Sequence, residues 1–120
     1  MKKTVIKILI FSLLISNIFV SYKLYKSSIL QLVILNGYNT QNFSIEPESF
    51  DRFDISFPNL TQTSVPIKLL KGRYYKKNGS FQKAITLFKE SIKLNPFLKM
   101  AEGELSLTYY DIQEYDSAYY

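Results

Sequence analysis

The side chains in this sequence that are best placed to bind a partner are three cations, Arg73, Lys76 and Lys77. Residues three and four positions apart lie on one face of a helix, so their spacing predicts a basic strip. Such a strip can hold the carboxylates of an acidic peptide or the phosphates of anionic lipids. It can equally be neutralised within the protein, because residues 42–65 and 100–120 on either side are acidic. The sequence leaves these three interpretations open.

The formal net charge of +5 does not indicate a nucleic-acid partner. A nucleic-acid site needs its basic residues gathered on one folded face. Here the whole excess comes from five lysines that flank or enter an apolar amino-terminal segment: Lys2, Lys3, Lys7, Lys23 and Lys26. The other basic residues are balanced by the acids. We therefore assign the excess charge to membrane insertion and expect no nucleic-acid partner.

The sequence lacks the residues on which most enzymes and metal sites depend. It contains no histidine and no cysteine, which removes the commonest general base, the thiolate nucleophile and the usual transition-metal ligands. Its glycines are isolated from one another, so the sequence has no phosphate-binding glycine loop. We therefore expect no catalysis, no cofactor and no metal.

The segment that carries the basic strip repeats itself after 34 residues. The recurring residues are Tyr75, Phe81 and Ala84, which return as Tyr109, Tyr115 and Ala118. A period of this length, with small and aromatic residues at matching places, is typical of paired antiparallel helices. In the first unit, Gly79 predicts the turn between the two helices and Ser80 the cap of the second. Pro96 predicts the end of that second helix, because a helix rarely includes the residue before a proline.

These two units resemble the tetratricopeptide repeat, over slightly less than half of the chain. The matching positions are Gly72, Tyr75, Gly79, Phe81, Ala84, Phe88 and Pro96 within residues 65–98, and Leu105, Tyr109, Tyr115 and Ala118 within residues 99–120. The departures from the family pattern are Lys68, Glu102, Ser106 and Gln113. The second unit contains little of its second helix, so we expect an incomplete repeat.

The resemblance implies that the protein binds another protein. In tetratricopeptide proteins, the first helices of successive repeats line a concave groove for a partner. The residues that the resemblance places in this groove are Leu69, Arg73, Lys76, Lys77, Leu107 and Tyr110. They do not reproduce the arrangement by which some relatives grip the carboxyl terminus of chaperones, so that specificity is not implied.

Residues 1–36 are expected to form a membrane anchor and a short helix that leaves the membrane. The apolar stretch from residue 5 to Tyr22 has about the 20 residues that a bilayer core requires. Tyr22 and Tyr25 are each followed by lysine, which is typical of a membrane interface. A cleaved signal peptide and a buried core helix are the alternatives, but no small-residue cleavage site is evident. The lysines before the span favour a cytoplasmic amino terminus with the rest exported.

Residues 37–64 form an acidic connector with too many aromatic residues for a plain flexible tether. Phe50, Phe53 and Phe57 stand at helical spacing, which predicts a short helix over residues 48–57 that caps the first repeat. The order of anchor, acidic helix and repeats is similar to membrane-anchored tetratricopeptide proteins of Bacteroidota-type bacteria. A composition rich in Ile, Lys, Asn, Tyr and Phe also suggests an AT-rich bacterial genome.

The expected fold is all-α: an amino-terminal transmembrane helix followed by a tetratricopeptide-like solenoid of antiparallel helix pairs. The expected protein is a scaffold, held in the bacterial inner membrane, whose repeats lie in the periplasm and bind a protein. Two alternatives stay open. One is the first part of a larger membrane enzyme or transporter that carries repeats, and the other is a secreted, soluble repeat protein after signal cleavage.

Overall fold

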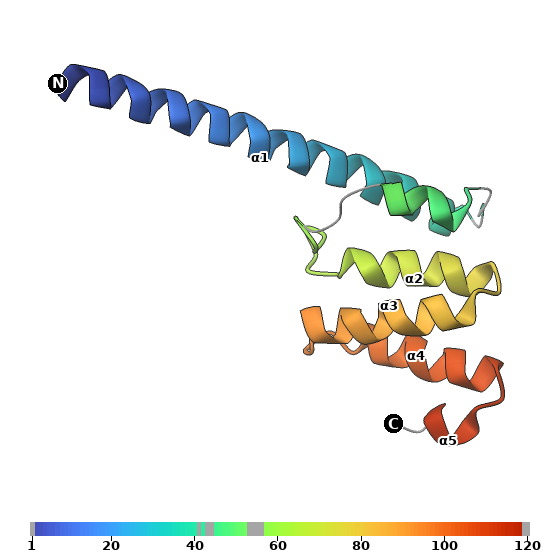
Figure 1. Cartoon of the computed structure of the whole chain (residues 1–120). Coiled ribbons are helices and arrows are strands. Elements are labelled where there is room, and N and C mark those ends of the chain that lie inside the picture. The colour runs from blue at the N-terminus through green and yellow to red at the C-terminus, as the bar shows by residue number, and fades with distance from the viewer. Residues whose placement is uncertain (1, 41, 43–44, 53–56, 119–120) are drawn as a thin grey trace.

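The computed structural model describes residues 2–40, 42, 45–52 and 57–118. All of the named secondary-structure elements in these residues are helices (Figure 1). The elements are α1 (Lys2–Asn39), the 3₁₀ helix η1 (Pro47–Arg52), α2 (Ile67–Lys77), α3 (Phe81–Leu94), α4 (Met100–Asp111) and α5 (Tyr115–Ala118). The helices α2, α3 and α4 lie side by side, and successive helices run in opposite directions. The expected all-α class is confirmed.

Helix α1 is continuous and extends far beyond the stack of the other helices (Figure 1). Within Lys3–Gly37, an 18-residue window has a mean hydropathy of 2.1 and no residue buried against the rest of the chain. Among the described residues, only this helix has the length and composition to cross a membrane. A signal sequence can have the same length and composition. We expected this helical segment to end at residue 36, but it continues to Asn39.

The last third of α1 packs onto α2, whereas the sequence suggested a piece that leaves or lies on the membrane. Leu30 and Ile34 are buried with Phe50 and Tyr74 in one core cluster. The Tyr74 hydroxyl donates a hydrogen bond of 2.9 Å to the carbonyl oxygen of Ile34, and burial raises the pKa of this hydroxyl. Gly37 allows this contact, because a Cβ there would lie 1.9 Å from the Tyr74 hydroxyl. The helix therefore joins the core directly.

The described part of the connector contains one short helix. η1 spans Pro47–Arg52 and Phe57 is not helical, whereas we expected a helix over residues 48–57, of which residues 53–56 lie outside the described residues. Phe50 is buried, as a capping helix requires, and its ring meets the Tyr74 ring edge-on with centroids 5.0 Å apart. Phe53 lies outside the described residues, and Phe57 is exposed. The cap on α2 is therefore formed by α1 and η1 together.

Helices α2 and α3 approach each other closely at Gly72. A Cβ on this residue would lie 2.6 Å from the ring of Phe88, so the ring occupies the space that any larger residue needs. The second core cluster forms around this contact and consists of Leu69, Tyr75, Ala84, Phe88 and Ala101. Because Ala101 belongs to α4, the cluster joins three helices and extends the core of the stack beyond the first hairpin.

The turn between α2 and α3 recurs with the same geometry between α4 and α5. Gly79 has φ 74 and Gln113, which follows 34 residues later, has φ 64. Three backbone hydrogen bonds recur at this offset. They run from Asn78 to Tyr74, from Gly79 to Lys76 and from Ser80 to Tyr75, and then from Ile112 to Thr108, from Gln113 to Tyr110 and from Glu114 to Tyr109. The backbone therefore repeats with the period of the sequence. Ser80 precedes α3 as predicted, but its side chain makes no capping hydrogen bond.

We expect Gly72→Ala to lower the free energy of unfolding by roughly 1–3 kcal/mol, because the added methyl group overpacks the contact with Phe88. Urea unfolding of the full-length chain in detergent micelles, followed by the near-ultraviolet circular dichroism of its tyrosines, measures the change. Gly103→Ala is the matched control, since a Cβ there meets nothing within 4 Å. Adding Phe88→Leu should offset part of the Gly72→Ala loss, so fully additive effects would contradict the contact.

Candidate partner-binding face

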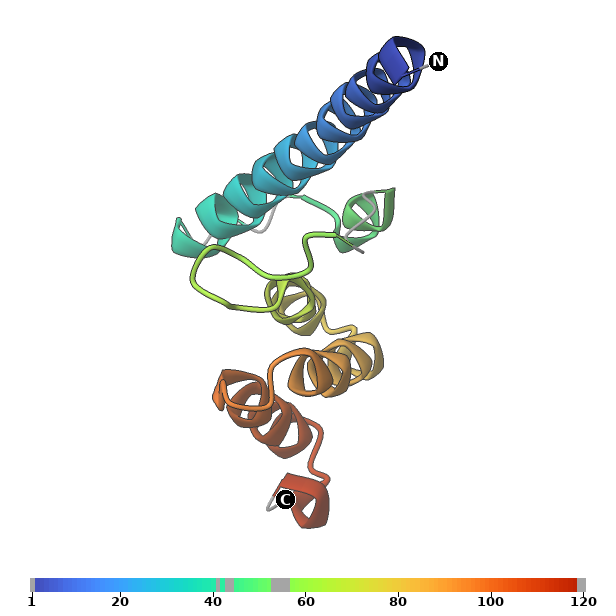
Figure 2. The ribbon, with the colours of Figure 1, turned by 90° about the vertical axis from the view of Figure 1, so that its left-hand side faces the viewer.

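The first helices of the two repeats, α2 and α4, share one face of the stack. Figure 2 shows α3 set to one side of α2 and α4, and α2 contacts α4 directly. The residues that the sequence analysis placed in a groove all belong to these two helices. The structure therefore places them near one another, but it gives them different environments.

The basic strip on α2 is paired with acids on α4. Arg73 donates from Nε to Oε1 of Glu104 at 2.8 Å. Lys76 lies 3.1 Å from Oδ2 of Asp111 and 3.9 Å from Oε2 of Glu104. Arg73, Lys76 and Glu104 are partly buried, which strengthens their attraction relative to fully exposed pairs. This geometry favours the interpretation that the flanking acids neutralise the strip.

The same complementarity recurs elsewhere in the described residues. Lys83 on α3 lies 3.5 Å from Glu48 of η1, and Lys68 on α2 donates to Glu90 on α3 at 2.6 Å. The charges of the first repeat therefore help to hold it against both the connector and its own second helix. Lys77, the third member of the strip, is exposed at the end of α2.

Leu69 was placed in the groove by the sequence analysis, and the structure corrects this. Its side chain is fully buried in the second core cluster, against α3 and α4. A residue in this position stabilises the stack and has no surface to offer a partner. The error arose because the alignment of the two repeats shows where Leu69 lies along its helix. It does not show how much of the Leu69 side chain the neighbouring helices cover.

Apolar residues on α4 provide the exposed apolar part of the shared face. Leu107 is 57% exposed and Tyr110 is 62% exposed. The surface of α4 at Gly103, one turn before Leu107, is open, because a Cβ built on Gly103 would have no other atom within 4 Å. Tyr115 on α5 extends the patch, with its ring 5.5 Å from that of Tyr110. From its sequence position, Tyr115 was expected only as a residue of the repeat signature, and no local pattern indicated that it is exposed.

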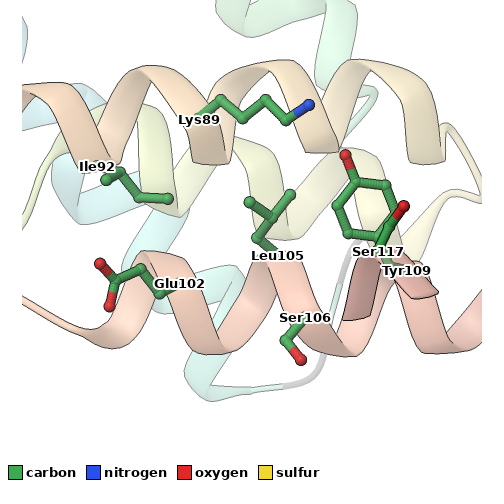
Figure 3. A pocket seen from close by; sticks show the side chains of 7 residues that line it. All are labelled: Lys89, Ile92, Glu102, Leu105, Ser106, Tyr109 and Ser117. Carbon is green, nitrogen blue, oxygen red and sulfur yellow. The ribbon is translucent and has the colours of Figure 1, made fainter. Parts of the chain in front are cut away.

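A pocket of about 420 Å³ lies on the opposite side of α4 (Figure 3). Its lining residues are Lys89, Ile92, Glu102, Leu105, Ser106, Tyr109 and Ser117. Figure 3 shows Leu105 and Tyr109 pointing from α4 towards α3, where Lys89 lies above them. The single turn of α5 covers little of this side of α4, whereas α3 covers α2 along its length.

The residues of the repeat signature fall into two structural groups. Four of them, Gly72, Tyr75, Ala84 and Phe88, meet between α2 and α3, and Leu105 packs against that cluster. The others lie at turns, at the pocket or at the surface: Gly79, Phe81, Pro96, Tyr109, Tyr115 and Ala118. Ser106, which replaces the glycine of the first unit, donates a hydrogen bond to the carbonyl oxygen of Ala118. This contact holds α5 against α4.

No protein-family model, no curated protein and no solved structure matches this chain closely enough to count as a relative.

Proposed function

We propose that this protein is a membrane-anchored scaffold whose tetratricopeptide-like repeats present the face shared by α2 and α4 to a protein partner in a bacterial envelope. In this proposal α1 crosses the inner membrane and the repeats lie in the periplasm. The observation that carries the proposal is the exposure of two apolar side chains, Leu107 and Tyr110, on that face. Contiguous exposed apolar groups with polar residues at their rim are typical of sites where proteins associate.

The tetratricopeptide-like part of the proposal is supported by the recurrence of one helix and one turn. α2 and α4 have nearly equal lengths, and the turns that follow them share positive φ values at Gly79 and Gln113. Each first helix is followed by a helix that runs back along it (Figure 1). Helix pairs that stack in this way form elongated surfaces suited to binding an extended peptide or a helix of a partner.

The anchoring part of the proposal is supported by the continuity of α1. The apolar stretch and the segment that packs on α2 belong to the same helix, without a break at residues 22–27. A helix is stiff over this length, so it would hold the stack close to the bilayer at a defined height. A scaffold attached in this way presents its binding face at one distance from the membrane.

The partner's chemistry follows from which groups on the face are already paired. An acidic peptide would have to exchange with Glu104 and Asp111 before it could reach Arg73 and Lys76. Leu107 and Tyr110 need no such exchange, because they face solvent. We therefore place apolar side chains of the partner on these two residues, with the ion pairs as a polar rim.

Photocrosslinking in the cells that produce the protein tests this proposal. A benzoylphenylalanine at position 107 or 110 of the full-length chain should give a discrete adduct with a second protein. The same probe at Gln82, which is exposed on α3 and outside the face, should give none. With the probe at 110, Leu107→Glu should lower the adduct yield roughly tenfold, since loss of an apolar anchor costs about 1.4 kcal/mol or more. Equal adducts at all three positions would contradict the proposal.

The alternative of a secreted, soluble protein after signal cleavage fits one feature of the structure. Leu30 and Ile34, the core residues of α1, come after the apolar stretch. Cleavage before residue 27 would leave the core intact, so the core itself does not require the anchor. The mass of the mature chain distinguishes the two, because only the anchored form keeps residues 1–26.

A further inference from the structure

Segments that are far apart in the sequence meet at the end of the stack towards which the free part of α1 extends (Figure 1). Ser27 of α1 donates from its hydroxyl to the carbonyl oxygen of Pro58 at 3.4 Å. Ser64 in the same connector accepts a bond of 2.9 Å from Nδ2 of Asn95, the residue that follows α3. These contacts place the turn between α3 and α4, residues 95–99, at this end of the stack.

This end of the stack lies close to the height at which a bilayer would begin. Tyr22 and Tyr25 are the aromatic residues that would mark the interface of the spanning segment. Ser27 follows Tyr22 by five residues, which is about 8 Å along a helix that rises about 1.5 Å per residue. The headgroup region on each side of the hydrocarbon core is roughly 5–8 Å thick. If α1 crosses the bilayer, the connector and the α3–α4 turn would therefore face the lipid headgroups.

The α3–α4 turn presents an apolar tip between two cations. Phe97 is 92% exposed, the largest exposure among the large apolar side chains of the described residues, and Met100 is also exposed. Lys93 and Lys99 flank the tip and are exposed too, with Lys99 forming an ion pair of 2.8 Å with Glu102. The exposed ring of Phe97 is apolar and is not stabilised by contact with water. The two lysines beside it are positively charged and would be attracted to a negatively charged surface.

We propose that the α3–α4 turn is a second membrane contact, in which Phe97 inserts into the bilayer interface and Lys93 and Lys99 approach the phosphates. This inference rests on the proposed membrane anchor. Apolar side chains with nearby lysines bind at the boundary between acyl chains and headgroups, and lysines near anionic lipids strengthen the binding. Helix α1 alone would let the stack rotate about the helix axis. A second contact fixes the direction in which the face of α2 and α4 points.

Tryptophan fluorescence tests the inference in the full-length chain, which contains no tryptophan of its own. Three variants each carry one reporter: Phe97→Trp at the turn, Phe11→Trp in the spanning segment, and Tyr110→Trp at the other end of α4. Phe11 and Tyr110 are both exposed in the isolated chain, so all three sites accept an indole. Each variant is reconstituted into vesicles of phosphatidylcholine and phosphatidylglycerol in which the phosphatidylcholine is brominated near the headgroup or near the chain ends.

The expected result is a different quenching pattern for each reporter. Trp emission at position 97 should shift to the blue and lose roughly half its intensity with bromine near the headgroup, because an interfacial indole meets the upper acyl chain. Position 11 should be quenched by bromine near the chain ends, and position 110 by neither. Quenching at 11 without quenching at 97 would overturn the inference and leave the anchor in place. No quenching at position 11 would instead contradict the proposal that α1 crosses the membrane.

Two further outcomes separate lipid from protein contact. If Trp at position 97 is shielded from acrylamide but unaffected by brominated lipid, a protein covers the turn and the inference is wrong. If Lys93→Gln combined with Lys99→Gln weakens the quenching at position 97 in these vesicles, and added salt does the same, the cations contribute as proposed. Unchanged quenching in both cases would show that Lys93 and Lys99 do not contribute to the membrane contact.

Discussion

Replacing Phe88 by alanine is expected to lower the free energy of unfolding by about 3–5 kcal/mol, the usual cost of truncating a buried phenylalanine. Phe88 is fully buried, lies against Gly72 and belongs to the cluster that joins α2, α3 and α4. Stabilities of small domains are about 5–15 kcal/mol, so the variant should lose a large share of its stability. Urea unfolding in detergent micelles, followed by tyrosine circular dichroism in the near ultraviolet, measures the loss.

Phe97→Ala is the matched control for this prediction. The chemical change is the same, but Phe97 lies almost entirely in solvent in the isolated chain. We expect its stability in micelles to change by no more than about 0.5 kcal/mol, as for other exposed positions. Equal losses for the two variants would mean that the second core cluster does not form as described. The same control variant also leaves the stack folded for the membrane measurements.

The second large effect is expected for Leu30→Ala, at about 2–5 kcal/mol. Leu30 is 1% exposed and packs with Ile34, Phe50 and Tyr74 in the cluster that joins α1 to α2. If the last third of α1 were only a membrane-exit segment, this substitution would have little effect on α2. The near-ultraviolet signal reports on the loss, because Tyr74 lies in this cluster and the spanning part of α1 stays helical in the micelle.

Leu32→Ala provides the comparison, two residues away on the same helix. Leu32 is 69% exposed, so its truncation removes few contacts and should change the free energy of unfolding by about 0.5 kcal/mol or less. A large effect at position 32 with a small one at position 30 would show that the helix is rotated relative to the stack. A small effect at both positions would show that α1 and α2 do not share a core.

Both pairs of variants test parts of the structure on which the proposed function depends. The Phe88 contact holds α4 in place, and with it Leu107 and Tyr110. The Leu30 contact joins the stack to the helix that would anchor it. A scaffold that has lost either contact could still reach the membrane, but it would no longer present its binding face in one orientation.

The sequence by itself determined the helical hairpin and its period. Gly79 and Pro96 mark the turn and the end of α3, because each imposes a local backbone constraint that needs no distant partner. The apolar spacing of α3 likewise requires an amphipathic helix. The recurrence of Tyr75, Phe81 and Ala84 after 34 residues predicted a second pair of helices, and α4 and α5 lie in its place.

Only the tertiary structure showed which side of the last third of α1 packs against α2. The buried residues of this third are Ser27, Leu30, Ile34 and Gly37, which follow one another at helical spacing. In the sequence they are mixed with Ile29, Leu32 and Leu35, which are equally apolar and exposed. A helix that is apolar on all sides gives no periodic signal, so the pattern could not show which side meets α2.

The tertiary structure also decided the state of the candidate site. The sequence showed cations on one repeat and acids on the next, but several pairings satisfy the same composition. The crossing of α2 and α4 selects Glu104 for Arg73 and Asp111 for Lys76, at distances of 2.8 and 3.1 Å. It buries Leu69 and exposes Leu107 and Tyr110. The exposure of a residue depends on how neighbouring helices are placed, which is a long-range property that local sequence patterns do not contain.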